Sequence, residues 1–272
     1  MLQTWWRRVA RVLVSRRVYL STIRPRTTLL LGVLCVAPSC NALGDLNFFT
    51  EEDDRQLGEE AYPQILAGEQ VVQSGPAHEM VNRIMNRLVS AAREEHASIV
   101  DKFAWQVELI DNDSTVNAFA LPGGKMAVYT GILPVAETEA GLAVVMGHEI
   151  AHVIERHGTE AMTRQYGVDV LIDIILEGDA AQLSRIAASL YHLRYGRDAE
   201  LEADALGLRF MARAGYDPRV AVQFWSRMAS LAGSSPPEFL STHPTHARRI
   251  DQIRDELPQV LPIYEANKAP TP

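Results

Sequence analysis

Apolar side chains recur along most of the chain at the spacing of about 3.6 residues that is typical of helices packed on a core. Thr50, an N-cap residue followed by acidic residues, begins the first of these stretches. Pro258 is expected to stop the last. They cover residues 50–66, 77–93, 139–158, 160–176, 180–195, 197–213, 217–228 and 247–256. This pattern predicts a mostly helical chain.

Two stretches follow the alternating pattern of strands. Phe103 to Ile110 carries aromatic and branched residues at alternate positions, and Asn117 to Gly131 contains two short strands around a Pro-Gly-Gly turn. The proline places this ribbon at a sheet edge, where an extended peptide can bind through main-chain hydrogen bonds. We therefore expect an α+β fold with a small sheet whose edge strand, Met126, Ala127, Val128 and Tyr129, faces a cleft. A plain hairpin without a binding role is the alternative.

Residues 139–158 contain the pattern His-Glu-x-x-His at His148, Glu149 and His152. On a helix, four residues carry His148 and His152 through one turn, so their Cβ atoms lie roughly 5 to 6 Å apart on one face. One zinc ion can bridge that separation. Glu149 lies about 100° round the helix from His148, near enough to hydrogen-bond a zinc-bound water without being a ligand. Glu149 is therefore the candidate general base.

The residues around this motif would bury it in an apolar environment, which favours a metal site shielded from water. These apolar neighbours are Leu142, Val145, Met146 and Ile150. Gly158 is expected to end the helix as its C-cap. The alternative is that His148 and His152 are two core histidines on a buried helix without a metal.

A second predicted helix, residues 197–213, carries carboxylates at helical spacing. Glu200 and Asp204 are four residues apart and share a face, so one can bind a metal while the other orients a ligand histidine. Ala203 and Gly207 indicate close packing of this face against another helix. Glu-rich helices usually present a solvated face, so the spacing of Glu200 and Asp204 is a weak indication when taken alone.

The first 40 residues differ from the rest of the chain. They hold seven arginines, and no acidic residue precedes Asp45. The apolar run from Leu29 to Ala37 is too short to span a bilayer and has the length of a signal-peptide core. We expect residues 1–40 to be a signal peptide, residues 41–272 to form a single domain with its core at about 50–257, and the protein to be exported.

Cys40 ends the segment Val-Ala-Pro-Ser-Cys, which resembles a bacterial lipobox. We expect the exported protein in the periplasm. A lipid on Cys40 is the only membrane attachment that we consider, and it would make the protein an outer-membrane lipoprotein. One alternative is ordinary cleavage after Ala42, and another is a twin-arginine export signal at Ser15 to Leu20. A third is an organelle transit peptide, which would place the protein in an intermembrane space; the distinct apolar run argues against it.

The charge and the cysteines restrict the partners. Without the seven leader arginines, 19 basic residues stand against 34 acidic ones, so we expect no binding to nucleic acid. Both cysteines, Cys35 and Cys40, lie in the leader, which leaves the domain without a thiol. Any metal must therefore bind through histidine and carboxylate.

Four separated motifs follow one another in the chain: N-A-F-A-x-P-G-G at 117–124, H-E-x-x-H followed by Arg156-His157, E-x-x-A-D at 200–204, and S-T-H-P at 241–244. In this order they resemble the HtpX and CAAX-prenyl-protease type of zinc metallopeptidase, metallopeptidase family forty-eight, and especially its short soluble bacterial envelope members. The resemblance covers residues from about 50 to 257. It implies that residues 41–272 form a gluzincin-like metallopeptidase domain with the predicted edge strand at its active-site cleft.

The resemblance also implies a role for each carboxylate of the E-x-x-A-D motif. Glu200 becomes the third ligand of one zinc ion per chain, beside His148 and His152, with water in the fourth position. Asp204 becomes the partner that orients a ligand histidine.

Two residues near the end of the domain match the family pattern as well. His243 in the S-T-H-P motif could reach the metal as a fourth ligand and gate the site, or it could belong to a loop that only caps a helix. Arg249 could stabilise the transition state or pair with a carboxylate.

Together these inferences predict a zinc-dependent endopeptidase of the cell envelope that cuts extended or unfolded polypeptides. Zinc would lower the pKa of its water and polarise the scissile carbonyl, while Glu149 removes the proton and delivers it to the leaving amine. The substrate would lie along Met126 to Tyr129, and the family suggests misfolded envelope proteins, hence protein quality control. The alternatives are a non-proteolytic zinc-binding module or holdase, and a structural helical lipoprotein without a metal.

Overall fold

The computed structural model describes residues 47–167, 171, 194–231, 233, 236–244 and 247–268. The predicted signal peptide and Cys40 lie outside these residues, as do residues 168–170 and 172–176 of the helix predicted over 160–176 and residues 180–193 of the helix predicted over 180–195. The assignments of the leader and of its lipid stay predictions.

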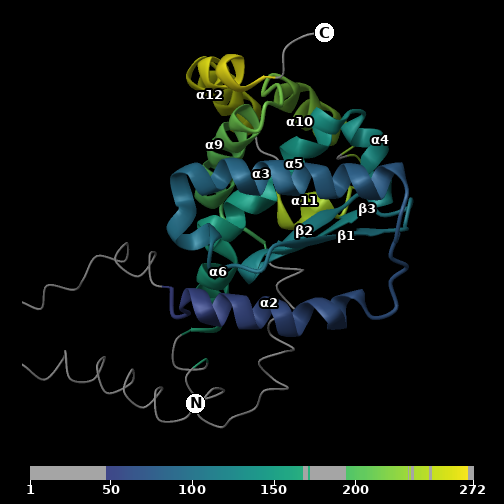
Figure 1. The fold of residues 1–272 in the computed structure, drawn as a ribbon, viewed down its shortest axis with the longest axis vertical. Helices are drawn as coiled ribbons and strands as arrows, with labels where there is room; N and C mark the ends of the chain where they lie inside the picture. Colours follow the sequence, from purple (N-terminus) through teal and green to yellow (C-terminus); the bar gives the residue numbers. More distant parts are fainter. Residues whose placement is uncertain are drawn as a thin grey trace, which may run out of the picture. The chain divides into compact units, whose positions relative to one another are not determined.

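The described part of the chain is α+β and mostly helical, as predicted. Figure 1 shows one small sheet between α3 on one face and α2 on the other. In chain order the elements are α2 (Glu51–Leu66), α3 (Pro76–Val100), β1 (Gln106–Ile110), β2 (Ala118–Leu121), β3 (Lys125–Tyr129), α4 (Leu133–Ala136), α5 (Glu139–Ile154), α6 (His157–Tyr166), α9 (Arg197–Arg213), α10 (Val220–Ser230), α11 (Phe239–Thr242) and α12 (Ala247–Asn267).

The sheet separates two apolar cores because successive side chains of a strand point to opposite faces. Met126 and Val128 of β3 pack into the larger core with α3, α5, α9 and α10. Ala127 and Tyr129 of the same strand pack into a smaller core with α2 and α6. The strands are therefore buried on both faces, and only their edges remain for contacts with other backbone.

The prediction that Met126 to Tyr129 forms the edge strand is wrong. The strand order is β1-β3-β2, in which β3 is central, parallel to β1 and antiparallel to β2. Pro122 lies in the turn between β2 and β3, where it removes no hydrogen bond of the sheet. Its presence therefore does not indicate which strand is at the edge. The edge strand beside α5 is β2, because the Ala120 backbone N–H donates a hydrogen bond to Glu149 of α5.

The helix that carries His-Glu-x-x-His is shorter than predicted. It ends at Ile154, and Gly158 lies inside α6 instead of capping α5. The chain turns at Arg156, which adopts a left-handed conformation with φ 59° and ψ 28°. The Arg156 guanidinium bonds to the Asp54 carboxylate and to the Phe49 carbonyl oxygen, and these contacts hold the turn.

Two helices run further than the sequence predicts. Helix α3 continues to Val100, which is buried, and α12 continues past Pro258 and Pro262 to Asn267. A proline inside a helix removes one backbone hydrogen bond. In α12 the burial of Val260 and the packing of Ile263 on the core favour continuation of the helix.

Helices α5 and α9 cross at two glycines. A Cβ atom on Gly207 would lie 2.9 Å from the backbone nitrogen of His148, and one on Gly147 would lie 3.2 Å from the Gly207 carbonyl oxygen. This close approach, which the small residues of α9 indicated, brings the carboxylates of α9 against the histidines of α5. Within the part of the chain that the structure describes, no helix is both long and apolar enough to cross a bilayer.

Candidate metal centre

Four buried side chains from three segments meet where α5 crosses α9. His148 and His152 come from α5, Glu200 from α9 and His243 from the residue after α11, and each is at most 2% exposed. One ligand atom from each lies within 4.8 Å of the others. The two Nε2 atoms of His148 and His152 are 3.0 Å apart, and they lie 3.6 and 3.5 Å from the Glu200 carboxylate. The structure thus brings together the three residues proposed as zinc ligands.

The chemistry of this donor set fits a metal ion. Two imidazole nitrogens and a carboxylate oxygen form a set that zinc prefers in catalytic sites. Burial, reinforced by nearby His148, holds the pKa of His152 well below its usual range, so its ring is neutral and has a lone pair. Burial alone would raise the pKa of Glu200, but His243 and the other two histidines lower it well below its usual range. An ionised carboxylate beside the neutral His152 imidazole is a state that binds a cation.

His243 enters the cluster from the segment that follows α11. Its Nδ1 lies 3.0 Å from Glu200 Oε1 and its Nε2 lies 3.3 Å from Glu149 Oε1. Burial lowers the pKa of His243, yet the charges of Glu200 and Glu149 outweigh that effect and raise it. The Phe239 ring stacks on the imidazole at a centroid distance of 4.5 Å, and Tyr195 N–H bonds to the Thr242 carbonyl oxygen. These contacts hold His243 against the centre in the closed arrangement that the structure shows.

Glu149 lies beside the cluster without belonging to it. Its Oε2 accepts a hydrogen bond of 3.0 Å from the Ala120 N–H of β2. Its Oε1 accepts no hydrogen bond of good geometry from the described residues, although His243 Nε2 lies 3.3 Å away. Burial raises the pKa of Glu149, and the nearby His243 and His148 offset only part of that shift. The carboxylate is held by one oxygen and leaves the other for a water or a substrate.

Asp204 and Arg249 support the cluster from behind. Asp204 Oδ1 lies 2.9 Å from His148 Nδ1, the ring nitrogen that points away from Glu200. Arg249 bonds to both oxygens of Asp204 at 2.6 and 2.8 Å and to Glu200 Oε2 at 2.8 Å, while its guanidinium lies 3.4 Å from the centre of the Trp225 ring. Burial would raise the pKa of Asp204, but Arg249 and His148 lower it. Of the two roles considered for Arg249, these contacts support the pairing with carboxylates.

The sequence of the chain matches the model of peptidase family M48 over residues 77–257. The chain belongs to peptidase family M48. This confirms the family that the four motifs indicated. The M48 match includes His148, Glu149, His152, Glu200, Asp204, His243 and Arg249.

Relatives of known name agree with this membership. The chain is 34% identical over 206 residues to the mitochondrial metalloendopeptidase OMA1 of Saccharomyces cerevisiae, covering 70% of this chain and 59% of that protein. It is 30% identical over 225 residues to the beta-barrel assembly-enhancing protease of Escherichia coli, covering 77% of this chain and 45% of that protein. Human metalloendopeptidase OMA1 is 29% identical over 232 residues. The chain thus spans about half the length of the curated relatives that it matches.

Two residues next to the metal centre had no role in the sequence analysis. His157, at the start of α6, lies with its Nδ1 2.9 Å from His152 Nδ1. The Tyr195 ring stacks on His152 at a centroid distance of 4.1 Å. The Arg156-His157 pair was visible as part of a motif, but on the continuous helix that we expected, His157 would not share a face with His152.

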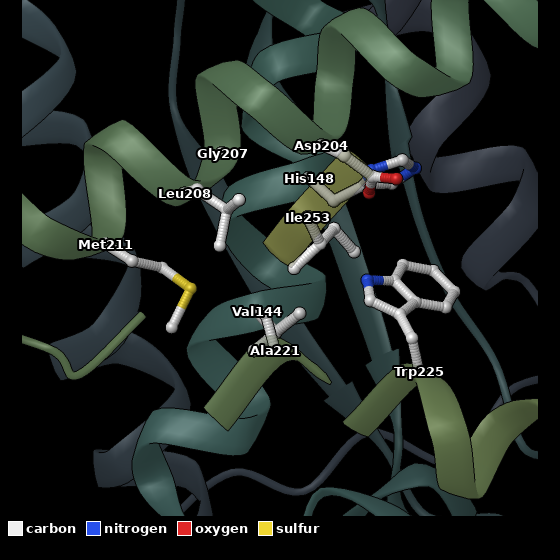
Figure 2. Close-up of a pocket in the computed structure, with 9 residues that line it drawn as sticks. All are labelled: Val144, His148, Asp204, Gly207, Leu208, Met211, Ala221, Trp225 and Ile253. Carbon is white, nitrogen blue, oxygen red and sulfur yellow. The ribbon is translucent and has the colours of Figure 1, made fainter. Parts of the chain in front are cut away.

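An apolar pocket lies behind His148, between α5, α9, α10 and α12. Figure 2 shows His148 and Asp204 side by side at one end of this pocket, with the Trp225 ring next to them. Its other walls are aliphatic or sulfur-containing side chains, including Val144, Leu208 and Met211. Apolar side chains thus line most of the rear of the centre, and the low local dielectric strengthens the bond between His148 and Asp204.

Proposed function

We propose that this M48 chain is a zinc metalloendopeptidase with one zinc ion held by His148, His152 and Glu200. The observation that carries the proposal is the convergence of these three side chains in a buried cluster with the Glu149 carboxylate beside it. Membership of M48 and the names of the relatives, several of which are metalloendopeptidases, support the same activity.

Glu149 acts as the general base. Zinc, when bound, supplies a Lewis acid that acidifies water and polarises a carbonyl group. Glu149 Oε1 takes the proton of the attacking water and passes it to the leaving amine, while the Ala120 N–H keeps the carboxylate oriented through Oε2. The raised pKa of Glu149 suits this role, because a carboxylate of higher pKa is the stronger base.

The rest of the polar cluster positions the ligands. Asp204 accepts from His148 Nδ1 and so leaves Nε2 as the ligand atom. Arg249 bonds to Glu200 Oε2, which leaves Oε1 facing His152. A buried cation next to two buried carboxylates also offsets part of the cost of removing them from water.

The substrate binds along β2 instead of β3. Strand β2 is the edge strand next to Glu149, and an extended segment that pairs with it would pass beside the proposed metal and base. Main-chain pairing of this kind requires an extended partner. The substrates are accordingly unfolded or locally extended polypeptides.

His243 is a fourth ligand that gates the centre. Its position next to Glu149 and Glu200 is the position that a substrate carbonyl and water would need. Movement of residues 241–244 away from the centre would open a coordination position, which catalytic zinc sites require.

The protein works in the cell envelope. The arginine-rich leader with its apolar run supports export, and a relative named as a beta-barrel assembly-enhancing protease supports a role in envelope quality control, with misfolded envelope proteins as substrates. Relatives named as mitochondrial support the intermembrane space of an organelle as the alternative. Attachment through a lipid on Cys40 rests on the sequence alone.

A non-proteolytic zinc module or holdase is the second candidate. The observation in its favour is that four side chains close the centre, as they do in structural zinc sites. The test is to measure zinc in the purified protein and casein digestion with and without a chelator, for the parent and for Glu149→Gln. The peptidase predicts one zinc per chain in both proteins, and digestion only by the parent without chelator. Equal behaviour of the two proteins towards casein would support the holdase.

A further inference from the structure

His157 lies directly behind the proposed zinc ligand His152. It is 5% exposed, and its Nδ1 is 2.9 Å from His152 Nδ1, on the side of that ring away from the metal. Its other nitrogen, Nε2, lies 3.4 Å from Oε2 of Glu202 in α9. A continuous polar connection therefore runs from Glu202 through His157 to His152.

The contact between His157 and His152 depends on the unusual turn at Arg156. Residues five apart on a continuous α-helix lie roughly 140° apart, so His157 would face away from His152 if α5 continued. The helix instead ends at Ile154, and Arg156 adopts a left-handed backbone conformation. This conformation is unfavourable for any residue with a Cβ atom. Contacts of Arg156 with Asp54 and Phe49 maintain it. Strain that is maintained in this way points to a functional placement of His157.

The ring nitrogens allow one consistent placement of protons. His152 Nε2 faces Glu200 and His148, so it must be unprotonated to bind a metal. The neutral His152 ring then carries its proton on Nδ1 and donates it to His157 Nδ1. His157 in turn carries its proton on Nε2, which faces the Glu202 carboxylate.

We propose that His157 is a positioning residue for His152, which accepts the Nδ1–H hydrogen bond and so fixes both the orientation and the tautomer of this ligand. The proposal rests on the function proposed above, because it concerns binding of the same zinc ion. The two ligand histidines are then held differently. His148 is held by an ionised carboxylate and His152 by a neutral imidazole.

The test compares zinc affinity in His157→Phe and His157→Gln with the parent, by competition with a chromophoric chelator. Phenylalanine keeps a ring but has no acceptor, and we expect it to weaken zinc binding by about 10- to 100-fold. Glutamine can accept from His152 and donate to Glu202, and we expect its affinity to stay within about threefold of the parent, because the hydrogen bond is retained. The Co²⁺-loaded proteins provide a second readout, since only His157→Phe should change the visible absorption bands.

The control variant is Thr163→Ala, which removes the hydrogen bonds of the Thr163 hydroxyl with the Phe48 backbone N–H and the Thr159 carbonyl oxygen without touching His152. It should lower the melting temperature of the metal-free protein and leave zinc affinity unchanged. Zinc binding by His157→Phe as tight as that of the parent, or equal weakening in Thr163→Ala, would overturn the proposal. A parent that binds no zinc would instead refute the proposed function, so the two failures are distinguishable.

Discussion

His243 Nε2 lies 3.3 Å from Glu149 Oε1, so the imidazole covers the free oxygen of the proposed general base. The same ring contacts Glu200 Oε1 through Nδ1. The His243 side chain therefore covers both the proposed general base, Glu149, and the proposed metal ligand Glu200.

Replacing His243 by alanine should raise peptidase activity and weaken zinc binding. The substitution frees Glu149 and opens one coordination position, but it also removes the proposed fourth ligand. We expect initial rates of casein digestion at saturating zinc to rise several-fold, and a chelator competition assay to show a higher dissociation constant for zinc. His78→Ala, a histidine of α3 paired with Asn82, is the control and should match the parent. A rate that does not rise in His243→Ala would remove the gating role.

An unfolded peptide should perturb β2 more than β1. The zinc-loaded Glu149→Gln variant would hold a substrate without cutting it, and pairing with the edge strand changes the environment of the backbone amides there. In a ¹H–¹⁵N correlation spectrum, we expect the largest shifts on adding a casein peptide at Ala118–Leu121, and small shifts at Gln106–Ile110. The reverse order would show that the substrate uses the other edge of the sheet.

Gly207→Ala should damage the metal centre from a distance. The new Cβ atom would lie 2.9 to 3.1 Å from backbone atoms of Gly147 and His148. Because these are backbone atoms, the clash can be relieved only if one helix moves. We expect a loss of about 1 to 3 kcal/mol in the free energy of unfolding, from urea titration, and weaker zinc binding because α9 moves Glu200 away from α5. The matched control is Gly196→Ala at the start of the same helix, where a Cβ atom meets nothing within 4 Å. Equal effects of the two substitutions would contradict this explanation.

Glu139, the first residue of α5, should stabilise the fold at neutral pH and not at acid pH. Hydrogen bonds from Arg83, with a further one from Tyr216, lower the pKa of this carboxyl. Because the folded pKa lies below the unfolded one, the contribution is complete above the unfolded pKa and is lost as the pH falls through the folded pKa. Glu139→Gln should therefore lower the free energy of unfolding by about 0.5 to 1 kcal/mol near pH 7 and by almost nothing near pH 3. The value at pH 7 is small because the side chains of Arg83 and Glu139 are partly exposed and solvent screens their interaction.

The measurement is urea unfolding of the metal-free protein at both pH values. Arg83→Met serves as the partner in a double-mutant cycle, because it removes the same hydrogen bonds from the other side. Additive effects at neutral pH, or a difference between parent and Glu139→Gln that persists at pH 3, would contradict the assignment.

Local spacing was sufficient to predict much of the centre. His148 and His152 share a face because they are four residues apart on one helix, and the same spacing puts Glu200 and Asp204 on one face of another. Gly207 indicated a close helix crossing. The structure shows the reason, because a Cβ atom added at this position would lie 2.9 Å from the backbone nitrogen of His148. Each of these inferences uses only the period of a helix or the size of a side chain.

The sequence by itself determined the helical period and the motif residues, because these depend on neighbours within a few positions along the chain, and the order of the motifs indicated the family. Tertiary structure alone decided which strand is at the edge. Strand β1 pairs with β3, and no local sequence pattern specifies which strands pair. Tertiary structure also decided that Arg249 pairs with Asp204 and Glu200, and that His157 contacts His152 after a left-handed turn at Arg156. Contacts of that kind form only when distant segments are packed, so they depend on the whole fold.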